Sequence, residues 1–413
     1  MLTRHGISKL GILYYSVTLA SILPCCSTYA QGSPHVVIIL GDKTSYGSRP
    51  RQLMTITENS HAGIADLSGA RIFGEDGSIL AFLDVANAPA PDDSWHFKCS
   101  LLIIDTMASV IITNLDLNGI VPVPMRAPLG QYMAVDAKNS EAYIPTFDHQ
   151  APNSFGFAEA NWKTRMLQIH TNSYKDLSLP YAVITIPSGF GMSFLDHKED
   201  TPRLTAALFD AATQTHRLVP LIYTYGKSSG IGQMLFLPTV GLIQYSLDVI
   251  TRSTNAALSA NLASPNRTRV PTAGMEIAEH RHPALFQLTD SALSTNGLIP
   301  AEIPVSAIAS EIFARTSDGK PCLVWGEKAD PESQDSAVSD IVIFDWNSKR
   351  ELLRKDIGTS TTTFQPSADG SRVYFLDSKD GMIKFLDVKS RNINPFSAEP
   401  VPNPAGATIV AAY

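Results

Sequence analysis

The sequence is poor in cysteine and in charge, and it has no excess of basic residues. Only four cysteines occur in 413 residues, and Asp, Glu, Lys and Arg together make up 17% of the chain. No two cysteines have the CxxC spacing of a zinc or redox motif. The net charge of −7 gives no electrostatic reason to bind nucleic acid. Because 44% of the residues are hydrophobic, the low charge excludes a disordered chain and predicts a large folded core.

The four cysteines also say little about disulfides. Cys25 and Cys26 lie in the N-terminal segment, which leaves Cys99 and Cys322 in the remainder of the chain. Export from the cell would permit a disulfide. Two cysteines so far apart in sequence are a weak basis for one, so the sequence leaves open whether these two thiols are free.

The N-terminal segment is typical of a signal peptide. Arg4 and Lys9 supply positive charge, and an apolar run follows from Leu10 to Leu23. The small-x-small pattern that ends at Ala30 predicts cleavage before Gln31.

We therefore expect residues 1–30 to be a signal peptide and residues 31–413 to be one exported domain, which is periplasmic if the source is bacterial. Two alternatives remain open. The apolar run could be an uncleaved anchor, although it is short for a membrane span. The chain could also be a lipoprotein, although Leu23 and Pro24 before the first cysteine are a poor match to the small residues of a lipobox.

Short strands and turns fill the rest of the sequence, which contains 27 prolines and 26 glycines. The clearest unit, PSADGSRVYFLDSKDGMIKFLDVKSRN, begins at Pro366 and contains two strands joined through an Asp-Gly turn. Its second strand is apolar, ends at an aspartate and is followed by a polar turn. The same pattern recurs upstream, with the aspartate or its substitute at these positions: Asp66, Asp105, Thr171 (after His170), Asp210, Asp248, Asp345 and Asp387.

This repeat predicts an all-β fold, a seven-bladed β-propeller with inserted loops. Most units are spaced by about 40 residues, the length of a four-stranded blade. A carboxylate at the strand end can accept the backbone N–H groups of the turn that follows. A ring also needs its ends joined, so residues 392–413 or those from Pro34 onward should complete the first or the last sheet. Residues 255–300 are a long insertion, either a helical excursion or part of an eighth blade. Unrelated hairpins in a β-sandwich are a further alternative.

Catalytic motifs are scarce. GMSFL, residues 191–195, lacks the final glycine of a nucleophile elbow and lies in a strand–turn–strand pattern. YGKSSG is preceded by Leu221 where a P-loop needs its first glycine. Two histidines in Glu279–His282 (EHRH) could face one side of a strand and bind a metal, but no third ligand is near them in sequence. We assign no catalytic residue and no metal ligand to this chain.

Three segments together resemble a known family. They are GEDGSILAFLDVANAPAP (residues 74–91), MLFLPTVGLIQYSLD (residues 234–248), and the pair VIFDWNSKRELLRKDIG and RVYFLDSKDGMIKFLDVKS near the C-terminus. Their order resembles the heavy, β-propeller subunit of the periplasmic methylamine and aromatic amine dehydrogenases. The resemblance implies a propeller that serves as a scaffold, forms part of a substrate channel and is not itself the redox catalyst.

The same resemblance implies partners and a cofactor held elsewhere. In that family two heavy and two light subunits assemble, and the light chain carries tryptophan tryptophylquinone. A primary amine is oxidised to an aldehyde and ammonia, and the electrons pass to a cupredoxin. By resemblance, the expected partners are an amine dehydrogenase light chain, a second heavy chain and a cupredoxin, and this chain holds no cofactor of its own.

Two departures from the family pattern leave other functions open. Asn87 stands where the family has a phenylalanine at the mouth of the substrate channel, and residues 179–200 lack the cysteines of the family's disulfide. One alternative is a divergent, stand-alone binding or scaffold propeller. Another is a self-contained propeller hydrolase of the lactonase type, with a metal on its axis.

Overall fold

A computed structural model describes most of the chain after Gly32, and the residues from Pro34 to Tyr413 form one compact unit. The described residues are 33–41, 51–67, 72–88, 96–117, 120, 130–131, 133–147, 154–175, 182–196, 203–223, 231–237, 240–253, 270–272, 275–287, 299–301, 308–328 and 337–413. The predicted cleavage site at Ala30 and Gln31 lies outside them.

The strands of this unit form seven sheets, numbered here in chain order, whose neighbouring strands run antiparallel except at the short β8. The first three sheets contain the following strands: first sheet, β1 (His35–Leu40), β2 (Arg51–Thr57), β3 (His61–Leu67) and β30 (Ala407–Ala412); second sheet, β4 (Ile72–Asp76), β5 (Ile79–Ala88), β6 (His96–Asp105), β7 (Val110–Asp116) and β8 (Gly130–Gln131); third sheet, β9 (Ala134–Asp136), β10 (Glu141–Phe147), β11 (Ser154–Asn161) and β12 (Met166–Lys175).

In the other four sheets, strands next to one another in sequence are also paired in space, except β18 and β19, which both pair with β20. They contain the following strands: fourth sheet, β13 (Ala182–Ile186), β14 (Gly189–Asp196), β15 (Arg203–Asp210) and β16 (Thr215–Tyr223); fifth sheet, β17 (Ile231–Leu237), β18 (Gly241–Ser253), β19 (Val270–Thr272), β20 (Met275–Gln287) and β21 (Ile299–Ala301); sixth sheet, β22 (Ile308–Ser317), β23 (Lys320–Glu327), β24 (Val338–Asp345) and β25 (Arg350–Thr361); seventh sheet, β26 (Phe364–Pro366), β27 (Arg372–Leu376), β28 (Ile383–Asp387) and β29 (Ile393–Pro395).

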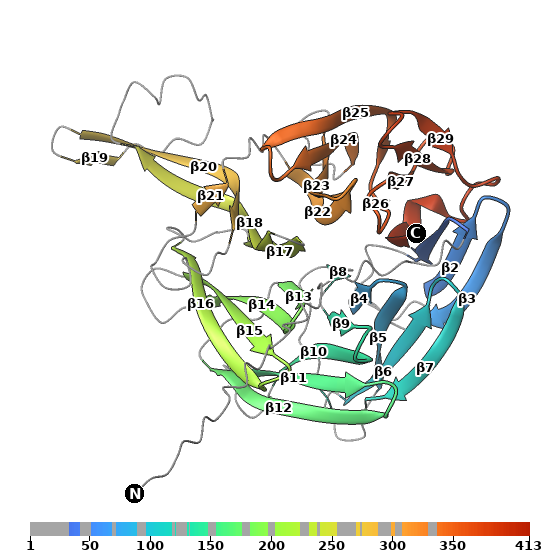
Figure 1. The fold of residues 1–413 in the computed structure, drawn as a ribbon, viewed down its shortest axis with the longest axis horizontal. Helices are drawn as coiled ribbons and strands as arrows, with labels where there is room; N and C mark the ends of the chain where they lie inside the picture. The colour runs from blue at the N-terminus through green and yellow to red at the C-terminus, as the bar shows by residue number, and fades with distance from the viewer. Residues whose placement is uncertain are drawn as a thin grey trace, which may run out of the picture. The chain divides into compact units, whose positions relative to one another are not determined.

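The sheets succeed one another as the blades of a β-propeller (Figure 1). Each sheet contacts the next through pairs of strands, namely β3 with β7, β4 with β9, β9 with β13, β13 with β17, β17 with β22, β22 with β26, and β26 with β30. The last of these contacts returns to the first sheet. The predicted all-β propeller is therefore confirmed, and seven sheets occur in the part of the chain that the structure describes.

The two ends of the unit meet in the first sheet. β30 pairs antiparallel with β1, so that Val36 lies opposite Ala412 and Leu40 opposite Ala407. The expected joining of the chain ends is thus present, with the last strand of the chain completing the first sheet.

The long insertion at residues 255–300 contributes strands where it is described. β20 pairs with β18 over most of its length, and β19 and β21 pair with β20. The described part of this segment therefore extends the fifth sheet and contains no helix.

Four of the expected aspartates lie at the end of the third strand of their sheet and bind the turn that follows. Asp105 Oδ1 accepts the N–H of Met107 at 2.9 Å. Asp345 Oδ1 accepts the N–H of Asn347 at 2.8 Å. Asp210 and Asp387 do the same for the third residue after them, at 2.9 and 2.7 Å. The sequence prediction for these positions is confirmed.

The other three positions were assigned wrongly. Asp66 and Thr171 lie in the outermost strands β3 and β12, and Asp248 lies within β18. In the first sheet, Thr57 ends β2, which is the third strand counted from the innermost strand β30. Its hydroxyl accepts the N–H of Ser60 at 3.1 Å. In the third sheet Asn161 Oδ1 accepts the N–H of Thr164 at 2.9 Å. The turn needs a side-chain acceptor, and threonine and asparagine supply one as well as aspartate does.

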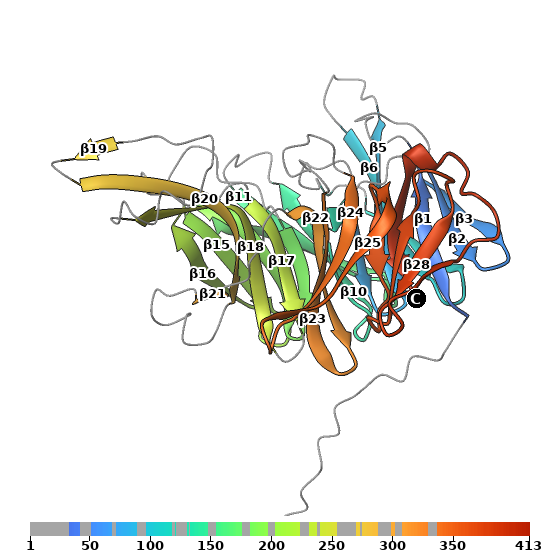
Figure 2. The same cartoon turned by 90° about the horizontal axis from the view of Figure 1, so that it is seen from above.

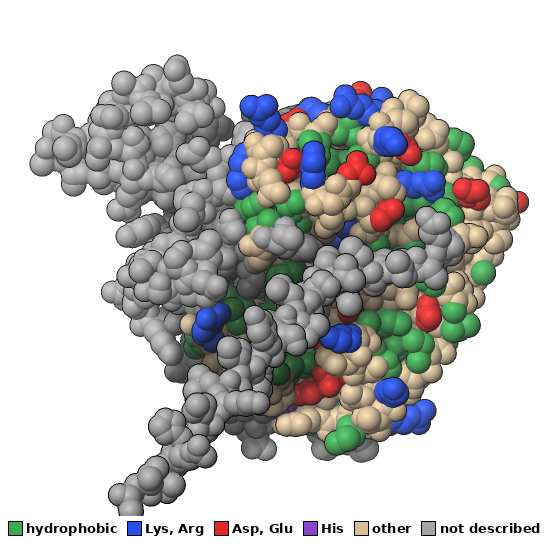
Figure 3. Space-filling model, viewed as in Figure 1, with side chains coloured by type: hydrophobic (Ala, Val, Ile, Leu, Met, Phe, Trp, Pro, Cys, Tyr) green, Lys and Arg blue, Asp and Glu red, His purple; other side chains and the backbone are tan. Residues whose placement is uncertain are grey.

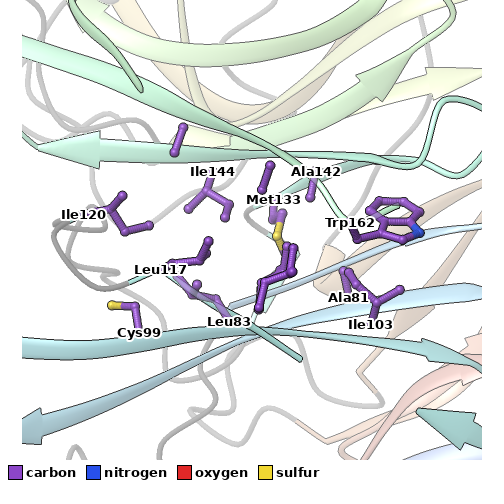
Figure 4. Packing of buried hydrophobic residues seen from close by; sticks show 14 of the residues in the cluster. Ala81, Leu83, Cys99, Ile103, Leu117, Ile120, Met133, Ala142, Ile144 and Trp162 are labelled. Atoms are coloured by element: carbon purple, nitrogen blue, oxygen red, sulfur yellow. The ribbon is translucent and has the colours of Figure 1, made fainter. Parts of the chain in front are cut away.

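The hydrophobic core lies between successive sheets. Side chains of the second and third sheets pack face to face, as Leu83, Ile103, Met133 and Ile144 illustrate (Figure 4). This packing is close enough to require glycine at position 74, because a Cβ there would lie 2.3 Å from the carbonyl oxygen of Met133. Burial of apolar surface between blades is the main source of stability in such a ring.

Two sequence questions are settled by this arrangement. Cys99 in β6 and Cys322 in β23 are buried and free. Residues 191–195 lie within β14, which pairs with a strand on both sides, so they form no nucleophile elbow. Among the described residues, no helix has the length and apolar character needed to cross a membrane.

Candidate functional site

A cluster of polar side chains joins the first strands of three sheets. Glu75 lies in β4, Arg315 in β22 and Gln365 in β26. Arg315 Nη2 donates to Glu75 Oε1 at 3.2 Å, and Gln365 Nε2 lies 3.5 Å from the same oxygen. The second and sixth sheets are not neighbours in the ring, so this contact lies in the space that the first strands enclose. We call Glu75, Arg315 and Gln365 the axial cluster.

The axial cluster is largely shielded from solvent. The side chains of Glu75 and Arg315 are 18% and 17% exposed, and Gln365 is 4% exposed. Burial raises the pKa of the Glu75 carboxyl, and the Arg315 guanidinium only partly offsets this. Glu75 is therefore a stronger base than an ordinary glutamate.

Arg315 keeps a donor free for another group. Its Nη1 donates to the carbonyl of Ala314 at 3.0 Å, and its Nη2 binds Glu75. Its Nε is buried and has no hydrogen-bond partner. A buried donor without a partner is costly, so this N–H is suited to a ligand or a water molecule.

Aromatic side chains hold Arg315 in place. The guanidinium carbon lies 5.7 Å from the centre of the Phe313 ring. Phe313 in turn meets Phe364 edge to face, with 5.4 Å between the ring centres. These contacts link the sixth and seventh sheets beside the cluster, so the guanidinium is positioned by packing as well as by its ion pair.

The residue after Glu75 ties the second sheet to the third. The N–H of Ala137 donates to Asp76 Oδ2 at 2.8 Å. Burial, and to a lesser extent the charge of Asp136, raise the pKa of Asp76 although this hydrogen bond lowers it. Asp76 thus connects the end of β4, next to Glu75, to the turn that follows β9.

The axial cluster does not suit the metal expected for a lactonase-type site. A cation bound to Glu75 would lie beside the Arg315 guanidinium, which repels it. In the part of the chain that the structure describes, no three His, Cys, Asp or Glu side chains are grouped to hold a metal ion. The cluster instead offers a base and a cation to a neutral or anionic ligand.

The sequence-predicted site residues lie elsewhere or are outside the described part. Asn87 lies in β5 opposite Phe97, beyond the residues of β5 that pair with β4. The ends of β5 and β6 project from the neighbouring strands (Figure 2). Its predicted place at a channel mouth stays a prediction. Glu279–His282 lies in β20, but its side chains are outside the described part of the structure.

Sequence reasoning missed the axial cluster, although a signal existed. Glu75, Arg315 and Gln365 each lie shortly before an Asp-Gly turn, in EDG, RTSDG and QPSADG. In all three segments the polar residue lies one or two residues before the end of the first strand, at different distances from the Asp-Gly pair. Their meeting across 240 and 290 residues depends on closure of the ring.

A second unusual feature lies on the outermost strands. Val110, Ile111 and Ile112 in β7, and Met166, Leu167 and Ile169 in β12, are exposed apolar residues. By contrast, β25 in the sixth sheet carries Arg, Glu and Asp on exposed positions, and charged side chains lie on this face of the molecule (Figure 3). We call the six exposed residues of β7 and β12 the apolar rim.

No family model and no curated protein matches the chain. Among solved structures, a putative 6-phosphogluconolactonase from Bacteroides uniformis is similar, with 13% identity, a TM-score of 0.48, and coverage of 91% of this chain and 99% of that chain. A periplasmic gluconolactonase from Pseudomonas aeruginosa has 13% identity and a TM-score of 0.45, covering 88% and 95%.

A third similar structure is the β-propeller domain of the Trilobed protease from Pyrococcus furiosus, with 10% identity, a TM-score of 0.45, and coverage of 79% of this chain and 82% of that chain. Values this low carry no information about the activity of the present chain.

Proposed function

We propose that this chain is a β-propeller hydrolase that opens a small cyclic ester, a lactone, at the axial cluster. The observation that carries the proposal is the pair formed by Glu75, whose pKa is raised, and Arg315, whose Nε is a buried donor without a partner. A carboxylate of raised pKa and a cationic donor within one shielded site can serve as the general base and the oxyanion donor in ester hydrolysis by water.

Each residue has a definite part in this reaction. The Glu75 carboxylate accepts a proton from a water molecule as the water oxygen attacks the lactone carbonyl carbon. The guanidinium of Arg315 donates hydrogen bonds to the oxyanion that forms. The bond to the ring oxygen then breaks, and Glu75 returns the proton to that oxygen, which leaves a hydroxy acid.

The choice of a lactone follows from the groups in the cluster. Glu75, Arg315 and Gln365 include no hydroxyl or thiol, so water itself must be the nucleophile. Direct attack by water is easiest on a reactive cyclic ester. Arg315 can also pair with a carboxylate or phosphate on the substrate, which favours acidic sugar lactones.

Hydrolysis of a panel of sugar lactones, followed by pH-stat titration of the acid released, tests this function. Glu75→Gln should lower kcat/KM by about 10²–10⁴-fold, the usual worth of a general base. Glu351→Gln, which makes the same change on the exposed face of β25, is the matched control and should leave the rate unchanged. Wild-type protein that hydrolyses no lactone faster than Glu75→Gln does would refute the proposal.

A second candidate function is supported by the apolar rim. Exposed apolar patches are typical of protein interfaces, and a scaffold subunit such as the heavy chain of an amine dehydrogenase needs one. In that case the light chain would hold the quinone and Asn87 would border the substrate channel in the periplasm.

Co-expression with an amine dehydrogenase light chain tests this second candidate. A complex that co-purifies and stains for quinone would support it, and Asn87→Phe should then alter the preference among amines. Failure to form a complex with the light chain, with the propeller folded, would refute it.

A further inference from the structure

The outer strand of the third sheet carries apolar side chains at an open edge. Met166, Leu167 and Ile169 are 69%, 37% and 46% exposed. On the side away from β11, no described strand pairs with β12. A row of unpaired backbone groups beside exposed apolar residues is a template for another strand, and monomeric proteins normally protect such edges.

Three other outer strands of the ring show such protections, although β16 also exposes Leu218. The outer strand β7 is as apolar as β12, but the turn before it, residues 106–109, contains no basic residue. β25 exposes Arg350, Glu351 and Arg354 along its length. β16 contains Pro220, and β29 has only three residues and ends in Pro395. β12 has ten residues, and its first half contains neither proline nor a charged residue.

We propose that β12 accepts an extended apolar segment of another protein as an added antiparallel strand, with acidic residues at the C-terminal end of that segment. Such strand addition draws its affinity from main-chain hydrogen bonds and its specificity from side-chain contacts. The proposal does not depend on the chemistry proposed for the axial cluster.

The acidic end is inferred from the turn that precedes β12. Lys163 and Arg165 are exposed in this turn, and β12 itself contains no acidic residue. In an antiparallel pair, the C-terminal end of the added strand lies beside the start of β12. Carboxylates at that end would therefore approach two cations.

Two other occupants fit less well. In a pair of β12 strands from two copies of this chain, the start of one strand would lie beside the end of the other, so that Arg165 would approach Lys175 of the second copy. A membrane surface is disfavoured because open backbone N–H and C=O groups are not satisfied by lipid.

Binding of short fluorescent peptides tests the proposal directly. The probe is TVTITVTVDE, labelled at its N-terminus, and fluorescence anisotropy gives its Kd for the full chain. TVTITVTVKK should bind about fivefold more weakly, the upper range for exposed ion pairs. TVTPTVTPDE, whose prolines cannot complete the strand ladder, should not bind. Hydrogen exchange in the complex should show new protection of backbone amides in β12.

Variants at exposed positions locate the binding edge without disturbing the core. Leu167→Lys should weaken binding of the acidic probe about tenfold, because apolar contact is lost and a charged side chain on the edge strand opposes the addition of another strand. Lys163→Glu leaves one cation, Arg165, and one carboxylate in this turn, so it should abolish the preference between the acidic and basic probes. Ile111→Lys on β7 is the control and should leave both affinities unchanged.

Three results would overturn the proposal. They are equal or tighter binding of the basic probe, loss of binding in Ile111→Lys with none in Leu167→Lys, and a dimer in light scattering that Leu167→Lys dissociates. The last result would assign β12 to contact between copies of this chain. Thermal unfolding of each variant separates loss of binding from loss of fold.

Discussion

The outer strands of the sixth and third sheets occupy the same place in their blades, yet they are built differently. In the sixth sheet, Arg354 of β25 forms an ion pair with Glu327, which also accepts the indole N–H of Trp325 at 2.9 Å. In the third sheet, β12 exposes Met166, Leu167 and Ile169. β25 is thus held to its own sheet by an ion pair, whereas β12 exposes apolar side chains to solvent.

This difference shows that blades of one ring need not serve one purpose. In the sixth sheet, the charged outer strand β25 pairs with a carboxylate of the same sheet, Glu327 of β23. The third sheet keeps its order through the aromatic side chains behind β12. Phe157 stacks on His170 of β12 with 4.2 Å between ring centres. Four predictions follow from the comparison, from the largest expected effect to the smallest.

Removal of the aromatic support behind β12 should have the largest effect. Phe157 is fully buried between the third and fourth sheets and touches Phe190 and Phe209. We expect Phe157→Ala to lower the free energy of unfolding by about 3–5 kcal/mol, because a large cavity replaces the ring. Urea denaturation measures this. A loss below about 1 kcal/mol would show that the third sheet does not depend on this cluster.

Removal of Glu327, which pairs with Arg354 of β25, should lower the free energy of unfolding by a smaller amount. Glu327 is 7% exposed, and Glu327→Ala leaves the Trp325 N–H without its acceptor. We expect a loss of about 1–3 kcal/mol in the free energy of unfolding. Glu351→Ala removes a second, exposed partner of Arg354 and should cost under about 1 kcal/mol. Equal losses in the two variants would contradict the special role of Glu327.

Acid should destabilise the charged blades before it affects the third sheet. In the seventh sheet, burial raises the pKa of Asp377, but hydrogen bonds from Lys384 and Thr359 outweigh it and lower the pKa below 3.8. A carboxyl with a lowered pKa contributes stability above its unfolded value, and that stability is lost as the pH falls through the folded value. Between pH 5 and pH 2, the free energy of unfolding should therefore fall less steeply with pH in Asp377→Asn than in the wild-type protein. An unchanged slope would contradict this role.

The smallest effect on stability is expected at the apolar rim. Leu167 is 37% exposed, so Leu167→Lys should change the free energy of unfolding by less than about 0.5 kcal/mol. Leu353 of the charged strand β25 is buried, 6% exposed, so Leu353→Lys should cost several times more than Leu167→Lys. Similar losses in the two variants would show that Leu167 has a structural role.

The repeat in the sequence was sufficient to predict the all-β propeller, because Asp105, Asp210, Asp345 and Asp387 mark strand ends that local hydrogen bonds define. It failed at Thr57 and Asn161, because aspartate marks the repeat in the sequence, whereas the turn requires only a side-chain oxygen acceptor. Such errors moved three positions without changing the class of fold.

The axial cluster could not be predicted in the same way. Glu75 and Arg315 are 240 residues apart, and nothing local in either segment indicates the other. Their contact arises from the ring as a whole. The apolar rim could not be predicted either, because the alternation of polar and apolar residues does not show that β7 and β12 are the outermost strands of their sheets.

The pairing of β30 with β1 has a consequence for the order in which the molecule is made. The first sheet lacks a strand until residues 407–412 have been synthesised, so its β1 edge stays open while the other described sheets can already form. Closing a loop of this length is slow relative to local hairpins. We therefore expect an open ring to precede the closed one during folding. Pairing of β30 with β1 then covers the edge of β1 at which a chaperone or a neighbouring chain could bind.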